Sequence, residues 1–513
     1  MLVKTFSSTV SGIDARTITI EVNVTPGLNF MLVGLPDNAV KESHQRIIAA
    51  LENNGMKMPG KKIVVNMAPA DLRKEGSHYD LPIAVGILAA SGQLPADELP
   101  KYVILGELSL DGSILPVKGA LPIAIQSLKD GFKGIILPKK NAREAAVVQN
   151  LDVYGVENIR EVAALLKGEE APGPVTVNTR EEYYAKIGDF EFDFHDVKGQ
   201  ESVKRALEVA AAGGHNVMMI GPPGSGKSML AKRMPTITPP MTLAEALETT
   251  KIHSIAGKIG VKGGLLSRRP FRAPHHIISD VALVGGGASP QPGEISLSHN
   301  GILFLDEFPE FNRHVLEVMR QPLEERAITI ARAKYTVEYP ANFMLVAAMN
   351  PCPCGYLTHP EKECTCTPAQ ITRYLGKISG PLLDRIDIHV EVIPVEIDSI
   401  TGKRDGENSR EVRERVVATR ERQRERFGSD GKVHCNAMMT PEQMENHCKL
   451  SQESISLIKD AMASLGLSAR AYDRIVKVSR TIADLAGTAD ISSEHIAEAI
   501  QYRSLDRQSW SGY

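Results

Sequence analysis

The residues best suited to chemistry form a glycine-rich loop that ends in a lysine and a serine. The loop consists of Gly221, Pro222, Pro223, Gly224, Ser225, Gly226, Lys227 and Ser228. Glycines at this spacing let backbone N–H groups surround phosphate oxygens, while the lysine reaches the β- and γ-phosphates and the serine hydroxyl ligates Mg²⁺. An apolar run, 216–220, precedes the loop, and a helical pattern, 229–234, follows it. We therefore predict that this strand, loop and helix bind ATP, with Mg²⁺ as the cofactor.

Two carboxylates follow a second apolar run. Residues 302–305 are all apolar, and Asp306 and Glu307 come directly after them. A buried strand would carry Asp306 to the Mg²⁺ ion and would let Glu307 polarise the water that attacks the γ-phosphate. A solvated turn is the alternative interpretation, but the phosphate loop upstream favours catalysis. Asn350 ends a third apolar run, 343–349, where an asparagine before a proline could also simply form a turn.

A loop rich in proline and glycine carries four of the six cysteines. These are Cys352, Cys354, Cys364 and Cys366. Four thiolates at short spacing suit a tetrahedral Zn²⁺ ion with a structural role. The C-x-C spacing is tighter than the usual C-x₂-C, so free thiols in an ordered loop are the alternative.

Length and composition bound the remaining functions. The chain has 513 residues, enough for about three domains, and its 42% hydrophobic and 24% charged residues are typical of soluble proteins. Because 59 Lys and Arg nearly balance 62 Asp and Glu, a nucleic-acid partner would need a local basic site. There is no run of roughly 18 or more apolar residues and no signal-peptide pattern, so we expect a cytoplasmic protein without a membrane partner. Six cysteines are too few for a disulfide scaffold.

Two segments carry local positive charge. Residues 251–279 include basic side chains and no acidic one, and residues 327–339 alternate like a β-hairpin with a basic tip. Such segments favour a polyanion such as DNA, although a solvated face is the alternative. The predicted DNA contacts are Lys258, Lys262, Arg268, Arg269, Arg332 and Lys334.

Apolar periodicity predicts an α/β fold in several segments. Residues 1–166 form an α/β domain with strands at 17–24, 62–66, 102–105, 134–137 and 152–156 and helices at 38–53, 81–90 and 120–128. Residues 167–192, rich in Pro, Gly and acids, form a linker. Residues 193–395 form the α/β core around the phosphate loop, and residues 396–513 form a helical lid with an exposed helix at 409–427.

Two stretches of the first domain, 68–82 and 110–119 followed by 134–140, resemble the peptidase domain of the Lon proteases and the C-terminal domain of the RadA repair ATPases. A Lon-type enzyme needs a serine nucleophile and a lysine base. In this chain the two positions fall on His78 and Leu121. Ser77 and Lys118 would fill them only after slips of one and three residues. We therefore predict a non-catalytic relative, used for assembly or substrate handling.

A further set of motifs runs through the core. They occupy residues 272–276, 285–287, 292–307, 320–324, 350–355 and 380–387. These stretches resemble the YifB/ComM family of bacterial magnesium-chelatase-like AAA+ ATPases, which is related to the magnesium chelatases and the MCM helicases. The resemblance implies a helix-2 insert, a pre-sensor hairpin and a hexameric ring that threads DNA. It also implies a helicase that drives branch migration during homologous recombination and natural transformation.

The resemblance also implies roles for single residues. Asn350 matches the polar sensor that contacts the γ-phosphate and the attacking water. Arg385 matches the arginine finger that reaches the nucleotide of the neighbouring subunit, with a structural salt bridge as the alternative. Arg470 matches the lid arginine that contacts the γ-phosphate in its own subunit, and Arg474 is the alternative.

These observations predict an ATP hydrolase that acts as a homo-oligomeric motor on single-stranded or branched DNA. Two other functions stay open. A protein-remodelling or protease-coupled ATPase is supported only by the Lon-like domain. A magnesium-chelatase-type motor would remodel a partner that binds a tetrapyrrole.

Overall fold

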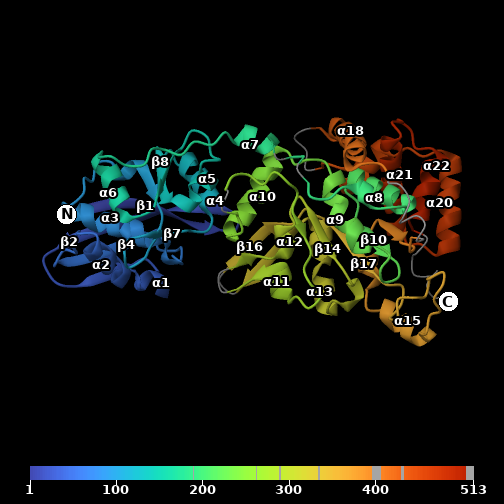
Figure 1. Cartoon of the computed structure of the whole chain (residues 1–513), viewed down its shortest axis with the longest axis horizontal. Helices are drawn as coiled ribbons and strands as arrows, with labels where there is room; N and C mark the ends of the chain where they lie inside the picture. The colour runs from blue at the N-terminus through green and yellow to red at the C-terminus, as the bar shows by residue number, and fades with distance from the viewer. Residues whose placement is uncertain are drawn as a thin grey trace. The chain divides into compact units, whose positions relative to one another are not determined.

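The chain folds into two compact units. The computed structural model describes residues 1–185, 187–188, 190–260, 263–287, 290–332, 335–395, 406–428 and 433–503. The first unit contains Met1–Lys186 and Leu243–Ser267, and the second contains Ile187–Thr242 and Arg268–Tyr513 (Figure 1). The chain therefore passes from the second unit back into the first and returns.

A seven-stranded mixed sheet forms the centre of the first unit. Its strands, in spatial order, are β3 (Phe30–Val33), β4 (Lys62–Ala68), β2 (Asp14–Thr25), β1 (Leu2–Ser11), β5 (Tyr102–Ile104), β8 (Gly134–Pro138) and β9 (Asp152–Val156). The pairs β1–β2 and β2–β4 are antiparallel, and the other neighbours are parallel. Strand β2 buries Ile18, Ile20, Val22 and Val24 on alternate positions, as the period of a strand requires. The five predicted strands are confirmed, and β1 and β3 extend the sheet.

Helices pack on this sheet. They include α1 (Asn38–Lys41), α2 (Ser43–Asn53), α3 (Asp80–Ala90), α4 (Ala120–Lys129), α5 (Lys139–Ala145) and α6 (Ile159–Lys167). Every residue of α3 is buried. A Cβ atom at Gly86 would lie 2.6 Å from Cγ2 of Val22, so the glycine lets α3 approach β2 closely.

Helix α10 (Leu243–Ile255) belongs to the first unit. Chain order alone predicts that this insert packs with the ATPase core, whereas the backbone N–H of Gly119, just before α4, donates to the carbonyl of Ser254 at 3.1 Å. Lys251 also lies 3.8 Å from Asp14 on β2. The predicted insert is therefore divided, since residues up to Ser267 fold with the first unit and residues from Arg268 fold with the second.

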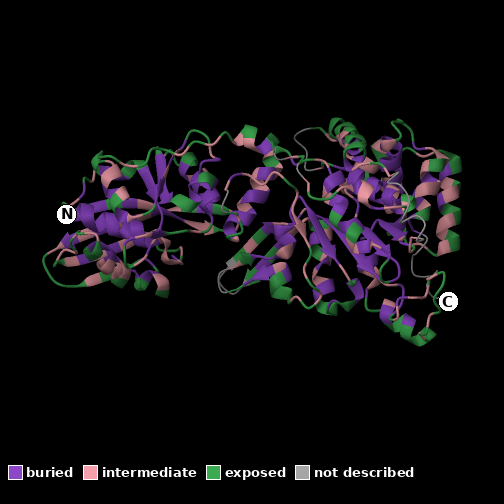
Figure 2. Cartoon of the chain, in the orientation of Figure 1, coloured by how far each residue is buried: buried purple, intermediate pink, exposed green. Residues whose placement is uncertain are grey.

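A five-stranded parallel sheet forms the centre of the second unit. Its spatial order is β11 (Phe271–Arg272), β14 (Ile302–Leu305), β17 (Met344–Met349), β10 (Val217–Ile220) and β18 (Ile388–Glu391). Strands β10, β14 and β17 are wholly buried, which explains their unbroken apolar sequences (Figure 2). Ile220 pairs with Met349 and Leu305 pairs with Ala347. The loops after these three strands therefore emerge at one edge of the sheet, where α/β proteins bind ligands.

The second unit also contains a predicted hairpin and a helical C-terminal region. Strands β15 (Ala327–Arg332) and β16 (Tyr335–Pro340) pair antiparallel, which confirms the hairpin. The C-terminal helices are α18 (Ser409–Phe427), α19 (Pro441–His447), α20 (Gln452–Leu465), α21 (Ala469–Leu485) and α22 (Ser493–Gln501) (Figure 1). Val412 and Ile475 of these helices share one buried cluster with Val217 and Met219 of the sheet. The structure thus confirms an α/β chain with a helical C-terminal region.

Candidate active site

The phosphate loop connects β10 to α9 (Lys227–Ile237). Gly224 and Gly226 have φ angles of +80° and +94°, which glycine adopts without strain. At Gly221 a Cβ atom would lie 2.1 Å from the carbonyl oxygen of Val392, so only glycine fits there. The loop therefore has the backbone shape that a phosphate cradle needs, directly before the positive end of a helix.

Lys227 is buried beneath this loop. Its ammonium group donates to the carbonyls of Gly221 at 2.6 Å and Pro222 at 2.8 Å, and to Oδ1 of Asn350 at 3.3 Å. Burial lowers the pKa of Lys227 to about 8, although the negative charge of Asp306 opposes this shift. The structure thus brings together the predicted lysine, at the start of α9, and the predicted sensor asparagine, directly after β17.

Ser228 and the two carboxylates meet at the same edge. The hydroxyl of Ser228 donates to Oδ2 of Asp306 at 2.6 Å. A hydroxyl and a carboxylate oxygen are ligands that Mg²⁺ takes beside nucleotide phosphates, so this pair fits the predicted metal site. Glu307 follows with a φ angle of +51°, a left-handed conformation that is strained in a residue with a side chain.

His276 is a neighbour of Glu307. Sequence reasoning favoured a hydrogen-bonded structural role for it over metal ligation and did not connect it with this carboxylate. Its Nδ1 atom lies 3.1 Å from Oε2 of Glu307. The histidine follows β11, the edge strand beside β14, and the two residues are far apart in the chain. Only its place in the motif 272–276 could have drawn attention to it. His276 can orient the carboxylate that was predicted to activate water.

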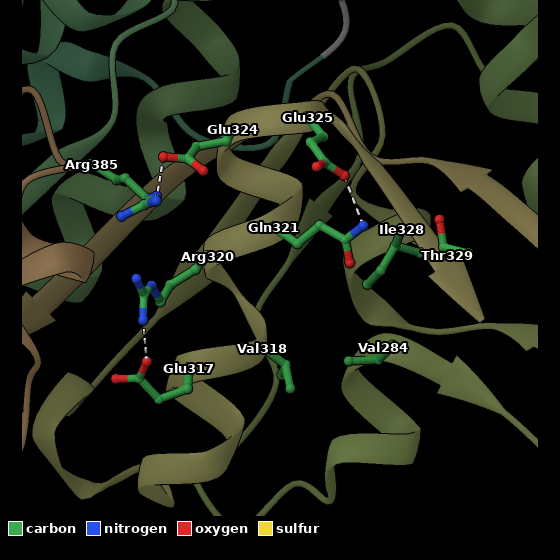
Figure 3. A pocket seen from close by; sticks show the side chains of 10 residues that line it. All are labelled: Val284, Glu317, Val318, Arg320, Gln321, Glu324, Glu325, Ile328, Thr329 and Arg385. Carbon is green, nitrogen blue, oxygen red and sulfur yellow. Dashed lines mark hydrogen bonds and ion pairs between the residues drawn. The ribbon is translucent and has the colours of Figure 1, made fainter. Parts of the chain in front are cut away.

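Arg385 lies at a separate pocket of the second unit. This pocket has a volume of about 490 Å³ and is lined by α13 (Arg313–Val318), α14 (Arg320–Glu325), β15 and Arg385 (Figure 3). The Arg385 guanidinium forms an ion pair with Glu324 and donates to the carbonyl of Pro381. Its Nε atom is buried and has no hydrogen-bond partner among the described residues.

A second arginine lines the same pocket. Arg320 donates to Glu317 at 2.9 Å, so each arginine here is paired with a glutamate (Figure 3). Burial lowers the pKa of Arg385, and the positive charges of Arg320 and Arg470 lower it further. Three arginines thus lie close enough to affect one another, an arrangement that suits a polyanionic ligand.

Three family models match the chain. The model described as magnesium chelatase, subunit ChlI, matches residues 193–400, and the model for its C-terminal part matches residues 406–503. A third, described as subunit ChlI of Mg-chelatase, matches residues 20–141.

Similar proteins cover nearly the whole chain. Competence protein ComM of Haemophilus influenzae is 45% identical over 98% of this chain and 97% of its own length. The uncharacterized protein YifB of Escherichia coli is 44% identical over 97% of this chain and 96% of its own length. The chain belongs to the YifB/ComM family of magnesium-chelatase-like proteins. The chloroplastic magnesium-chelatase subunit ChlI of rice is more distant, at 24% identity over 57% of this chain and 65% of its own.

Membership of the YifB/ComM family makes this chain an AAA+ ATPase, for which ATP and Mg²⁺ are the implied ligands. Among the described residues, no helix is long and apolar enough to cross a bilayer.

The two candidate lid arginines differ in their surroundings. Arg474 forms an ion pair with the buried Asp387 at 3.1 Å. Burial alone would raise the pKa of Asp387, but the charge of Arg474, the nearby His215 ring and the backbone N–H of Asn216, which donates to Oδ2 at 2.9 Å, hold it well below its usual range. Arg474 therefore has a structural partner. Arg470, at the start of α21, is exposed and is the better placed of the two to meet a ligand.

The four loop cysteines lie together. The Sγ atom of Cys352 is 3.3 Å from that of Cys354 and 3.6 Å from that of Cys364, and the last two are 3.5 Å apart. With Cys366, all four sulfur atoms lie within 4.8 Å of one another. The cluster can therefore hold a metal ion.

The predicted DNA contacts are spread over both units. Lys258 is exposed in the first unit, and Lys262 lies outside the described residues. Arg268 stacks over the ring of Phe190 at 5.6 Å, and Arg269 donates to the carbonyls of Pro239 at 2.6 Å and Asn300 at 2.7 Å. Arg332 ends β15, and Lys334 lies outside the described residues. The hydrogen bonds of Arg269 give it a structural role. DNA contact by any of the six residues stays a prediction.

Proposed function

We propose that this AAA+ ATPase is a ring-forming motor on DNA, a helicase that promotes branch migration in homologous recombination and natural transformation. The observation that carries this proposal is the 45% identity, over 98% of the chain, with a protein named for competence. The sequence similarity therefore extends over the lid, the hairpin and the first unit as well as the nucleotide site.

Each residue of the nucleotide site has a role in the proposal. The phosphate loop and Lys227 bind the phosphates of ATP, and Ser228 and Asp306 hold Mg²⁺, which neutralises phosphate charge when bound. Glu307, oriented by His276, takes the proton of the attacking water. Asn350, hydrogen-bonded to Lys227, contacts the γ-phosphate and this water.

A second copy of the chain completes the reaction. Arg385 lies in a pocket, and its Nε atom has no hydrogen-bond partner in the described part of the chain, so it can stabilise the phosphates of a nucleotide held by a neighbour. Arg470, exposed at the start of α21, contacts the γ-phosphate from the lid of its own subunit. Sites between copies require a head-to-tail interface, and we propose that this interface closes into a hexameric ring.

Mixing two inactive variants tests this arrangement. Arg385→Ala and Lys227→Ala should each reduce ATP turnover by about a thousandfold. The first removes a positive charge that stabilises the transition state, and the second removes a side chain that binds the phosphates. A mixture should regain turnover, since a Lys227→Ala subunit can lend its arginine to the intact phosphate loop of its neighbour. A mixture that stays inactive would contradict a site between subunits.

The DNA track is tested separately. Turnover should rise severalfold on adding fork or Holliday-junction DNA and less with linear duplex, and the stimulation should weaken with salt because phosphate contacts release counterions. Arg332→Ala with Lys334→Ala should remove the stimulation, whereas Lys459→Ala, on the exposed surface of α20, should retain it. Stimulation by casein instead of DNA would favour a protein-remodelling ATPase.

A magnesium-chelatase-type function is the second candidate. It is supported by the three family models described for subunit ChlI and by the 24% identity with rice ChlI. Such a motor would show no stimulation by any DNA and would co-purify with a partner that binds a tetrapyrrole.

A further inference from the structure

The four-cysteine loop has the stereochemistry of a metal site. In a tetrahedral Zn²⁺ site with thiolate ligands, neighbouring sulfur atoms are about 3.8 Å apart, as follows from a Zn–S distance of about 2.3 Å. The three Sγ–Sγ distances between Cys352, Cys354 and Cys364 are 3.3, 3.5 and 3.6 Å. Cys366 completes a set in which all sulfur atoms lie within 4.8 Å, and none of the four forms a disulfide. The arrangement is thus close to what one metal ion requires.

Backbone groups around the cluster favour thiolates. The N–H of Cys354 donates to Sγ of Cys366 at 3.3 Å, and the N–H of Cys366 approaches Sγ of Cys364 at 3.5 Å. Such N–H donors lower the charge on the sulfur ligands of a metal and fix their orientation. The chain between Cys352 and Cys364 has no helix or strand among its described residues. A metal would therefore replace secondary structure as the support of this loop.

The cysteine loop lies beside the sensor asparagine. Cys352 follows Asn350 by two residues at the end of β17. Within the loop, a Cβ atom at Gly355 would lie 3.8 Å from Cγ of Asn350, and directly after Cys366 the side chain of Thr367 caps α15 (Pro368–Leu375). Asn350 therefore lies against the segment that the cysteines close.

The loop also contacts the phosphate loop. Gly355, one residue after Cys354, has a φ angle of +84°, and a Cβ atom there would lie 2.5 Å from Cδ of Pro223. A glycine at this position lets the cysteine loop lie directly against Pro223. The metal cluster, the sensor and the phosphate loop are thus three contiguous parts of one structure.

We propose that Cys352, Cys354, Cys364 and Cys366 hold a Zn²⁺ ion that positions Asn350 for ATP hydrolysis. The cysteines are positioning residues, since they act on the reaction through Asn350. Loss of the metal loosens the loop beside Asn350, so Asn350 loses its alignment with the γ-phosphate and the attacking water. Loss of the metal leaves Lys227 and the glycines of the phosphate loop in place. The metal therefore controls kcat more than nucleotide affinity. The inference rests on the proposed nucleotide site.

Metal content gives a test that does not depend on activity. The purified chain should contain one zinc per polypeptide, and Cys364→Ser and Cys366→Ser should each reduce this to a small fraction. Cys448→Ser is the matched control, because Cys448 is buried in the C-terminal region beside the sulfur of Met439, and it should retain the zinc. Cobalt in place of zinc should give the absorption bands of a tetrahedral thiolate site. Absence of zinc from the wild-type chain, or zinc that persists in both loop variants, overturns the proposal.

Turnover then separates positioning from binding. Cys364→Ser should lower kcat about tenfold, as is typical when support for a reactive group is lost, while KM for ATP changes by less than about twofold. If that variant fails to fold, the wild-type chain treated with a chelator should show the same loss, and added Zn²⁺ should restore it. An active wild-type chain whose kcat is unchanged by metal loss refutes the inference alone, whereas an inactive, zinc-loaded wild-type chain refutes the proposed ATP hydrolysis.

Discussion

The two units contain similar reactive side chains in opposite surroundings. At the Lon-like site of the first unit, Ser77 donates to Glu107, and the buried Lys74 donates to the carbonyl of Pro69. At the nucleotide site of the second unit, Ser228 donates to Asp306 and Lys227 approaches Asn350.

The partners decide what each site can do. In the first unit the serine has a carboxylate in place of a lysine base, and burial lowers the pKa of the neighbouring His78 to about 4. In the second unit the reactive groups contact each other at a sheet edge, where phosphates and Mg²⁺ can replace those contacts. A set of reactive residue types therefore indicates a catalytic site only when a substrate can replace the contacts that these side chains make with one another.

The largest expected effect compares one glutamate from each unit. Glu307→Gln should lower ATP turnover about a thousandfold, because an amide cannot accept the proton of the attacking water. Glu107→Gln should leave turnover unchanged, because its partner Ser77 belongs to a site that we consider non-catalytic. Steady-state ATP hydrolysis with DNA present measures both variants. Loss of turnover in Glu107→Gln would show that the first unit takes part in the reaction.

Two buried aspartates give the next comparison. Asp387 is paired with Arg474 in the second unit, and Asp80 is paired with Arg46 in the first, with Oδ2 at 2.6 Å from Nε. Asp387→Asn should lower the free energy of unfolding at pH 7 by about 3 kcal/mol, since it breaks a buried ion pair. Asp460→Asn, on the exposed face of α20, is the control and should change it little.

The stability changes of Asp387→Asn and Asp80→Asn should depend on pH with opposite signs. The pKa of Asp387 is depressed, so its stabilisation is complete above the unfolded-state pKa of about 4 and is lost as the pH falls further. Burial raises the pKa of Asp80 despite Arg46, so its stabilisation is complete at low pH and declines as the pH rises through the folded-state value. Denaturant unfolding of Asp387→Asn and Asp80→Asn, each compared with the wild-type chain between roughly pH 3 and pH 8, measures both trends. Parallel trends would contradict the assigned surroundings.

Proton uptake should accompany ATP binding through Lys227. Its pKa is about 8 in the unliganded chain, and phosphates will raise it, so affinity is fullest below pH 8 and declines above it. Between about pH 7 and pH 9 the ATP dissociation constant should rise about tenfold. Calorimetry in buffers of different ionisation enthalpy detects the proton directly. A flat affinity profile would mean that Lys227 stays charged without nucleotide.

Local sequence patterns predicted the parts of the site that single segments determine. The phosphate loop, Asp306 and Asn350 each follow an unbroken apolar run, and such runs form buried parallel strands with aligned ends. Contacts between distant segments left no comparable pattern. The pairing of His276 with Glu307, and the packing of α10 against the first unit, depend on tertiary structure alone. The pocket shared by Arg320 and Arg385 was likewise visible only in the structure.

The smallest expected effect concerns His276, the residue that only the structure connected to catalysis. His276→Gln should lower kcat about fivefold, because Glu307 keeps its carboxylate but loses the partner 3.1 Å away that orients it. KM for ATP should change little, since His276 is not among the groups that we assign to phosphate binding. His275→Gln is the matched control, because the centroid of that neighbouring ring lies 4.2 Å from that of His276, with the two rings tilted by 35°. Equal losses in both variants would mean that the segment after β11 supports the fold of the site and that His276 has no specific effect on Glu307.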